Sequence, residues 1–185
     1  MRHAVLPVVP ALLLGACAAT GSRFDDHLAA APAMADEQAR LVVFRQRNTP
    51  QYSVREARLE VDRTAAGTVM PAGFRVFDVA AGSHTIVVDM WDAPGRCELT
   101  LDLKGGATHY VEVAPRIESW AAGAPALAAP ALAPLGTYGG LLATALLLSG
   151  MAVESAGKPC GGAYSLVAVD GAEALPKLAQ MRSSQ

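Results

Sequence analysis

Charged residues are scarce in this sequence of 185 residues: Asp, Glu, Lys and Arg together make up 17%, against about a quarter in an ordinary soluble protein. The formal net charge is −2, and no run of like charges forms an interaction tail. Because the chain has no basic surplus with which to neutralise phosphates, we do not expect nucleic acid as a partner. The length suits one domain.

The patterns of catalytic and metal sites are also missing. The sequence contains no G-x-S-x-G nucleophile elbow and no glycine-rich phosphate loop between a strand and a helix. His84, Cys97 and His109 fall on successive predicted strands, but no two share the close spacing of zinc ligands. Carboxylates such as Asp102 and Glu112 are expected to face solvent. We therefore predict that the protein is not an enzyme and has no catalytic residues, no metal and no cofactor.

The first residues have the features of an export signal. A basic start is followed at 5–14 by an apolar run that is too short to span a membrane and that contains two prolines. The sequence LGAC that ends at Cys17 resembles the bacterial lipobox. That resemblance implies lipidation of the Cys17 thiol and removal of the signal peptide, residues 1–16. The alternatives are a plain secretion signal cut near Ala16, Ala18 or Ala19 and an uncleaved anchor.

The residues after the lipobox bear on location. Ala18 follows the cysteine, instead of the Asp that retains many such proteins at the inner membrane. We therefore expect a lipid-anchored protein of the bacterial cell envelope, on the periplasmic face of the outer membrane. Several acyl chains would make this anchor stable. The alanine-rich stretch that completes 17–39 is predicted to be a flexible tether.

A period of two begins at residue 40 and predicts β-strands. Glycine, proline and asparagine separate the strands, with one turn expected at 65–67. Six short strands at this spacing, followed by a final strand near 163–169, are typical of an antiparallel sandwich. The six strands are expected at 40–46, 54–62, 74–80, 83–91, 97–103 and 108–115.

The domain is predicted to close with residues 159–185. Asp170 can cap a helix start, with Glu173 three residues on, and Pro176 is expected to begin a second short helical piece. The predicted fold is therefore mainly β: a single antiparallel β-sandwich of about seven strands, with an apolar helical or hairpin insertion and a short C-terminal helix. The sandwich core is assigned to 40–116 and the insertion to 117–158.

Four stretches of the predicted core carry a resemblance to a known family: LVVFR, LEVD, FRVFDVAAGSHTIVV and LDLKGGATHYVEV. In this order and spacing they resemble the DUF2846 group of bacterial lipoproteins, whose function is unknown. More broadly they are similar to PEGA-type and carboxypeptidase-regulatory-like sandwiches. One departure is Asp62-Arg63, where the family commonly has Asp-Gly, so we expect a longer turn here. The resemblance implies a fold and no activity.

The insertion contains no charged residue from 120 to 153. An alanine- and proline-rich piece is followed by an apolar stretch at 136–153, which is near the length of a membrane-spanning helix. Three interpretations stay open at this point. The stretch packs on the sandwich, or it contacts the membrane surface or a partner protein, or it spans the membrane.

Three cysteines are present, and assigning Cys17 to lipid leaves Cys97 and Cys160. Both lie at predicted strand ends, and the bacterial periplasm is oxidising. We expect a disulfide between them that stabilises the fold by ~4 kcal/mol and clamps the insertion at both ends. The alternative is one buried and one exposed free thiol.

These observations together predict a non-catalytic envelope lipoprotein. Its sandwich is an interaction or structural module that faces the periplasm. Residues 120–153 are expected to contact the membrane or a partner protein. The alternative is a carbohydrate- or peptidoglycan-binding module in which Trp91 and Trp120 stack on the ligand. Aromatic residues make up only 5% of the chain, so fold analogy is the main support for the alternative.

Overall fold

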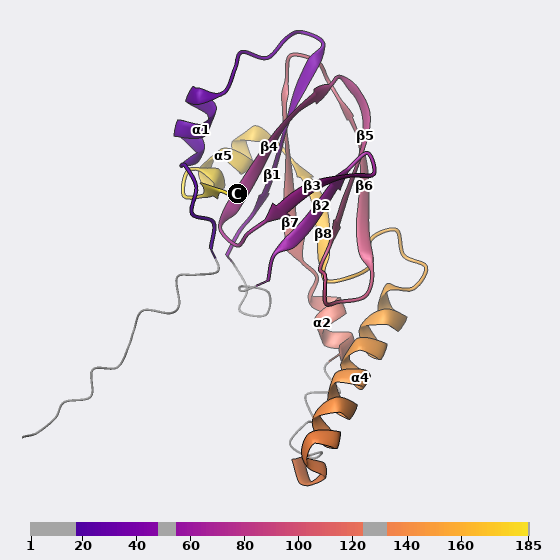
Figure 1. The fold of residues 1–185 in the computed structure, drawn as a ribbon. Helices are drawn as coiled ribbons and strands as arrows, with labels where there is room; N and C mark the ends of the chain where they lie inside the picture. The colour runs from indigo at the N-terminus through magenta and orange to yellow at the C-terminus, as the bar shows by residue number, and fades with distance from the viewer. Residues whose placement is uncertain (1–17, 48–54, 124–132, 185) are drawn as a thin grey trace, which may run out of the picture.

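The computed structural model describes residues 18–47, 55–123 and 133–184. Two β-sheets pack face to face, so the chain is mainly β and forms a sandwich (Figure 1). The five-stranded sheet has the order β8 (Tyr164–Val169), β7 (Thr108–Pro115), β1 (Gln38–Arg45), β4 (Gly73–Ala80), β9 (Arg182–Ser183). The four-stranded sheet has the order β3 (Thr64–Val69), β2 (Ala57–Val61), β5 (Gly82–Asp89), β6 (Arg96–Leu103).

The sandwich is mostly, but not wholly, antiparallel. β1 pairs with β7 in parallel, and so does β4 with the short β9. The pairing of β1 with β7 is parallel because of the route of the chain between them. The chain leaves the five-stranded sheet after β1 and again after β4, and each time it forms two strands of the other sheet before it returns. Between β4 and β5 the change of sheet takes only Ala81 and the start of β5, where Gly82 has a φ of 134°. This backbone conformation favours glycine.

Two hydrophobic cores stabilise the fold. The larger lies between the sheets and includes Leu41, Val43, Ile86 and Val111. A smaller one lies on the outer face of the five-stranded sheet, under helices α1 (Phe24–Ala30) and α5 (Gly171–Leu178). The central strand β1 contributes to both, which explains its uninterrupted apolar run at 41–44, since a strand buried on both faces need not alternate.

The prediction of a flexible tether at 17–39 is wrong for the described residues. Phe24 is 1% exposed and meets Phe74 edge-to-face, with ring centroids 5.1 Å apart. The Gly21 amide donates to the carbonyl of Ser183, which belongs to β9. An alanine-rich composition concealed one buried aromatic residue, and that residue fixes the segment to the domain. The described chain therefore begins at the surface of the sandwich, with no free spacer after residue 18.

The β2–β3 turn also differs from expectation. It has two residues, Asp62 and Arg63, at φ 50° and 65°, which is the left-handed geometry of a type I′ hairpin. The expected turn at 65–67 is instead part of β3, where Leu59 pairs with Gly67 and Glu60 with Ala65. This register leaves Ala66 as the extra residue of a bulge.

The C-terminal helix is present as predicted, and the Asp170 side chain accepts from the Glu173 amide at 2.8 Å. It continues through Pro176 to Leu178, so the expected break at Pro176 is absent. Glu112, expected to face solvent, is only 7% exposed. Because α5 covers this face of the sheet, Glu112 accepts from Lys177 at 2.7 Å.

The helical insertion projects from one end of the sandwich, which we call the lower end. It is the edge where Arg45 pairs with Gly73 and where Pro115 pairs with Tyr164. Helices α2 (Ile117–Gly123) and α4 (Gly136–Ser155) project from it, with the short η2 (Ala133–Leu135) before α4 (Figure 1). The chain near residue 18 lies at the same end, because the Ala19 amide donates to the carbonyl of Pro71.

Candidate functional site

The most unusual surface of the described protein is that of α4. This helix of 20 residues is long and apolar enough to cross a membrane, yet only 11% of its apolar window is buried. It contacts α2 and η2 and extends away from the sheets (Figure 1). The expected helical insertion is therefore present, but it does not pack on the sandwich as a core helix. Its exposed large side chains are Tyr138, Leu141, Leu142, Leu146, Leu148 and Val153.

The partly or fully buried positions of α4 form one stripe at helical spacing. Gly139 and Met151 are buried, and Ala143 and Leu147 are intermediate. Residues four apart share one face of a helix, so this stripe is the side turned toward the rest of the insertion. All the other faces are turned outward, and they carry no charge between 136 and 153.

Three hydroxyl side chains of α4 donate to backbone carbonyl groups of the same helix. Thr144 donates to the carbonyl of Gly140 at 3.0 Å, and Ser149 to that of Leu146 at 3.0 Å. Ser155, at the end of the helix, donates to the carbonyl of Met151 at 2.7 Å. These side chains therefore have a hydrogen-bond partner without water.

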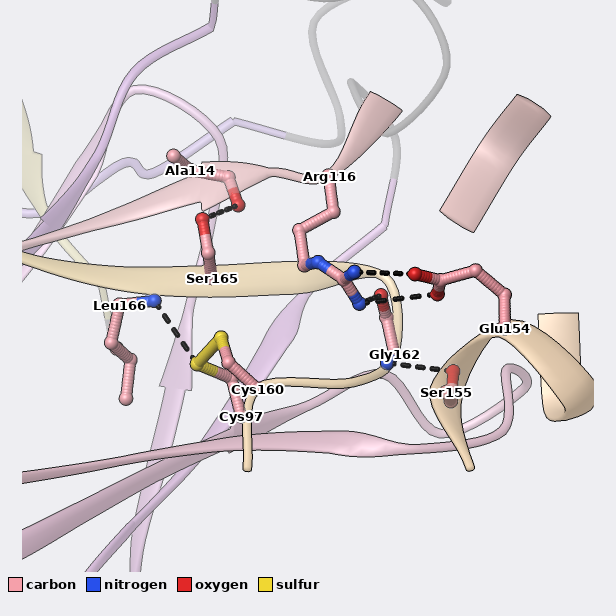
Figure 2. Close-up of a disulfide and its surroundings, with 9 residues drawn as sticks. All are labelled: Cys97, Ala114, Arg116, Glu154, Ser155, Cys160, Gly162, Ser165 and Leu166. Atoms are coloured by element: carbon pink, nitrogen blue, oxygen red, sulfur yellow. Dashed lines mark hydrogen bonds and ion pairs between the residues drawn. A yellow bond between two sulfur atoms is a disulfide. The ribbon is translucent and has the colours of Figure 1, made fainter. Parts of the chain in front are cut away.

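Charged residues return where α4 meets the sandwich. Arg116, which follows β7, donates to Glu154 at 2.6 Å and to the carbonyl of Gly162 at 3.0 Å (Figure 2). Both side chains are 12% exposed. Lys158 binds the same carboxylate. The two chain segments that bound the insertion are thus held side by side, a contact the sequence analysis missed. The sequence signal for this contact was the pair of charged residues, Arg116 and Glu154, on either side of the charge-free stretch.

A disulfide closes the same junction. Cys97 on β6 and Cys160 have sulfurs 2.00 Å apart (Figure 2), which is the pairing expected from the sequence. Cys97 is 1% exposed, and its sulfur also accepts from the Leu166 amide on β8. Since β6 and β8 belong to different sheets, the disulfide fastens the four-stranded sheet to the chain that returns from α4.

The two tryptophans proposed to stack on a ligand differ in what the structure describes. Trp91 lies in the β5–β6 loop at the lower end and is 58% exposed. The Arg55 guanidinium lies 5.7 Å from the centroid of its ring, and Arg55 also pairs with Asp92 at 2.9 Å. Trp120 belongs to α2, but its side chain lies outside the described part. A stacking surface formed by both rings therefore remains a prediction.

The residues considered as metal ligands have other partners. The sulfur of Cys97 is in the disulfide, and His109 Nε2 accepts from the Lys104 amide at 2.9 Å. His84 contacts the Asp62 carboxylate through Nδ1 at 2.5 Å and the Ala80 carbonyl through Nε2 at 2.8 Å. The hydrogen bond to Asp62 raises the pKa of His84, and the bond from the Thr85 amide lowers the pKa of Asp62. No group of three metal-ligating side chains occurs in the described ranges.

Cys17, the residue predicted to carry lipid, lies outside the described residues. Ala18 and Ala19, the first residues that the structure describes, lie at the lower end of the sandwich. Comparison with models of known protein families and with curated proteins finds no match to this chain. The resemblance to the lipoprotein group therefore remains a prediction that rests on the quoted motifs.

Proposed function

We propose that this protein is a non-catalytic lipoprotein of the bacterial envelope. Its β-sandwich is an interaction or structural module, attached through Cys17 to the periplasmic face of the outer membrane. The order of basic start, short apolar run and LGAC supports the anchor. The position of Ala19 supports it further, because this residue, two after the proposed site of the lipid, is hydrogen-bonded at the lower end.

The observation that carries the proposal is the exposed apolar surface of α4. A contiguous apolar surface of this kind marks a contact with a membrane or another protein, since soluble monomers rarely expose one. A protein at a membrane has a use for such a surface at the end that carries its anchor. The sandwich then serves to hold this surface in place.

Acylation is tested by metabolic labelling with a clickable palmitate analogue in a bacterial host, followed by separation of the inner and outer membranes by density. We expect label on the full-length protein in the outer-membrane fraction. The Cys17→Ala variant should lose the label completely. A matched control, Cys97→Ala with Cys160→Ala, removes the other two cysteines and should keep it. Label that survives Cys17→Ala would refute the proposed anchor.

A second candidate, glycan binding, has one observation in its favour, the exposed ring of Trp91. Arg55 covers one face of that ring, which leaves a single face for a sugar. Binding to immobilised peptidoglycan fragments that Trp91→Ala abolishes would support this candidate. Equal retention of the native protein and the variant would remove it.

A further inference from the structure

The outward surface of α4 calls for a surrounding medium that is apolar on several sides. A helix that docks in a groove, or that lies flat at a membrane surface, has one apolar face and one polar face. On α4 one stripe faces the insertion, and the exposed large residues elsewhere are apolar. Leu141 is 65% exposed and Val153 is 78% exposed. Hydrocarbon surrounds a helix in this way, whereas a protein groove does not.

The length and the ends of α4 match the thickness of a bilayer. Its 20 residues extend about 30 Å, close to the hydrocarbon core of a membrane. No charged residue occurs from 120 to 153. The charges of the insertion lie at the sandwich end, at Glu118 in the first turn of α2 and at Glu154 and its partners. Tyr138, 81% exposed, lies near the opposite end, and tyrosine is enriched where a helix reaches the lipid headgroups.

The hydrogen bonding of α4 suits the same medium. A polar side chain in hydrocarbon is costly unless it finds a partner within the protein. Thr144 and Ser149 are exposed, and both donate to carbonyl groups of their own helix. The middle of α4 therefore exposes apolar side chains together with two hydroxyl groups that are already hydrogen-bonded within the helix.

The topology excludes a single pass. The insertion leaves the sandwich after Arg116 and returns at Glu154, and these two side chains are 2.6 Å apart. The disulfide at Cys160 secures the returning chain to β6. Both ends of the insertion are thus held on one side of the membrane, so the chain that leaves the sandwich at α2 must return to it through α4, as in a hairpin.

Two further features place the membrane at the lower end. Trp91 is exposed there, and tryptophan is enriched at the membrane interface because its ring is apolar with one polar edge. The chain at residue 18 reaches the same end. The hairpin, the exposed tryptophan and the proposed lipid would therefore meet one membrane surface together.

We infer that the helical insertion of α2 and α4 is a membrane hairpin, in which α4 crosses the hydrocarbon core and both ends of the insertion stay on the side of the sandwich. α4 lies in the hydrocarbon of the bilayer, Arg116, Glu154 and Lys158 mark the level of the headgroups, and the sandwich stands end-on at the surface with Trp91 in contact with it. The choice of membrane rests on the proposed function, but the hairpin itself has its own test.

The test uses full-length protein extracted in mild detergent and reconstituted in vesicles of phosphatidylethanolamine and phosphatidylglycerol. A phospholipid with a photoreactive group in the middle of its acyl chain is included, and labelled peptides are identified by mass spectrometry. We expect label within 141–153 and none on β2 or β3. In Leu146→Asp the label in this stretch should fall at least tenfold, because a carboxylate at mid-bilayer is strongly disfavoured.

The matched control is Val167→Asp on β8, since Val167 is 46% exposed and Leu146 is 47% exposed. It should leave the labelling unchanged. Label confined to residue 17 and its neighbours would overturn the hairpin and leave the lipoprotein proposal intact. Label in α4 of a protein whose Cys17 carries no lipid would sustain the hairpin and refute the proposed anchor. Absence of lipid label, with α4 crosslinked to another protein in cells, would overturn the inference in favour of a protein partner.

Discussion

Removal of the Cys97–Cys160 disulfide is the perturbation whose size follows most directly from the structure. The two cysteines are 63 residues apart, so the bond restricts a long loop of the unfolded chain. On the chain-entropy model this amounts to ~4 kcal/mol of folding stability. For a protein of this length the melting temperature would fall by roughly 8–16 °C. We expect this loss in the double variant Cys97→Ala with Cys160→Ala, measured by urea and thermal unfolding in mild detergent.

Two controls separate the cross-link from the side chains. Addition of reductant should lower the stability of the native protein toward that of the double variant and should leave the double variant unchanged. The hydrogen bond from the Leu166 amide to the Cys97 sulfur is retained on reduction and lost in the variant, so the variant should be less stable by about 1 kcal/mol. A native protein whose unfolding is unaffected by full reduction would refute the reasoning.

Three smaller predictions test other parts of the fold. Phe24→Ala should lower the free energy of unfolding by ~3–5 kcal/mol, because Phe24 is 1% exposed against Phe74; an unchanged midpoint in urea would mean that residues 18–37 do not belong to the domain. Arg63→Gly should stabilise the hairpin by roughly 0.5–1 kcal/mol, since Arg63 has a φ of 65°, and a loss of stability would contradict the type I′ assignment. The pair of His84 and Asp62 should stabilise the fold most between about pH 4 and pH 6.5. Because the pKa of His84 is raised, its contribution to stability is lost as the pH rises through that pKa; because the pKa of Asp62 is lowered, its contribution is lost as the pH falls through the Asp62 pKa. His84→Gln should flatten the pH dependence of the free energy of unfolding measured in urea. An unaltered pH profile would count against the pair.

Seven of the nine strands that the structure describes were predictable from the sequence because at least one side of each is buried, whereas β3 and β9 were not predicted. The alternation in CELTLDL, for example, becomes β6, with Cys97 and Leu103 almost fully buried. The second core was not predictable. Its helices cover the outer face of the five-stranded sheet, and only the doubly buried run of β1 pointed to it. Glu112 was misassigned for this reason, since its partner Lys177 is 65 residues away on α5.

The wrong predictions for the β2–β3 turn and for the tether both have local causes. Asp62 and Arg63 adopt left-handed backbone geometry, but neither is a glycine, so the sequence does not indicate the turn. The nearest glycine, Gly67, lies beside the bulge in β3 and suggested a turn there. The segment at 18–37 is mostly small residues, so the contribution of Phe24 to the outer core was outweighed by composition.

The insertion was predictable as a helix but not as an exposed one. A charge-free helix has the same composition in a protein core, in a membrane or at an interface. Only the positions of Arg116, Glu154 and the disulfide show that the helix leaves the sandwich and returns to the same place. These contacts join residues that are far apart in the sequence.

The central claim is that this protein is held at a membrane by lipid on Cys17. The most direct measurement is the intact mass of the full-length gene product after extraction from bacterial membranes without reductant. We predict the mass of residues 17–185 plus diacylglyceryl and amide-linked acyl groups, less two hydrogens for the disulfide. A mass that corresponds to an unmodified chain, whether it begins at residue 1 or after a cut near residue 16, would contradict the account.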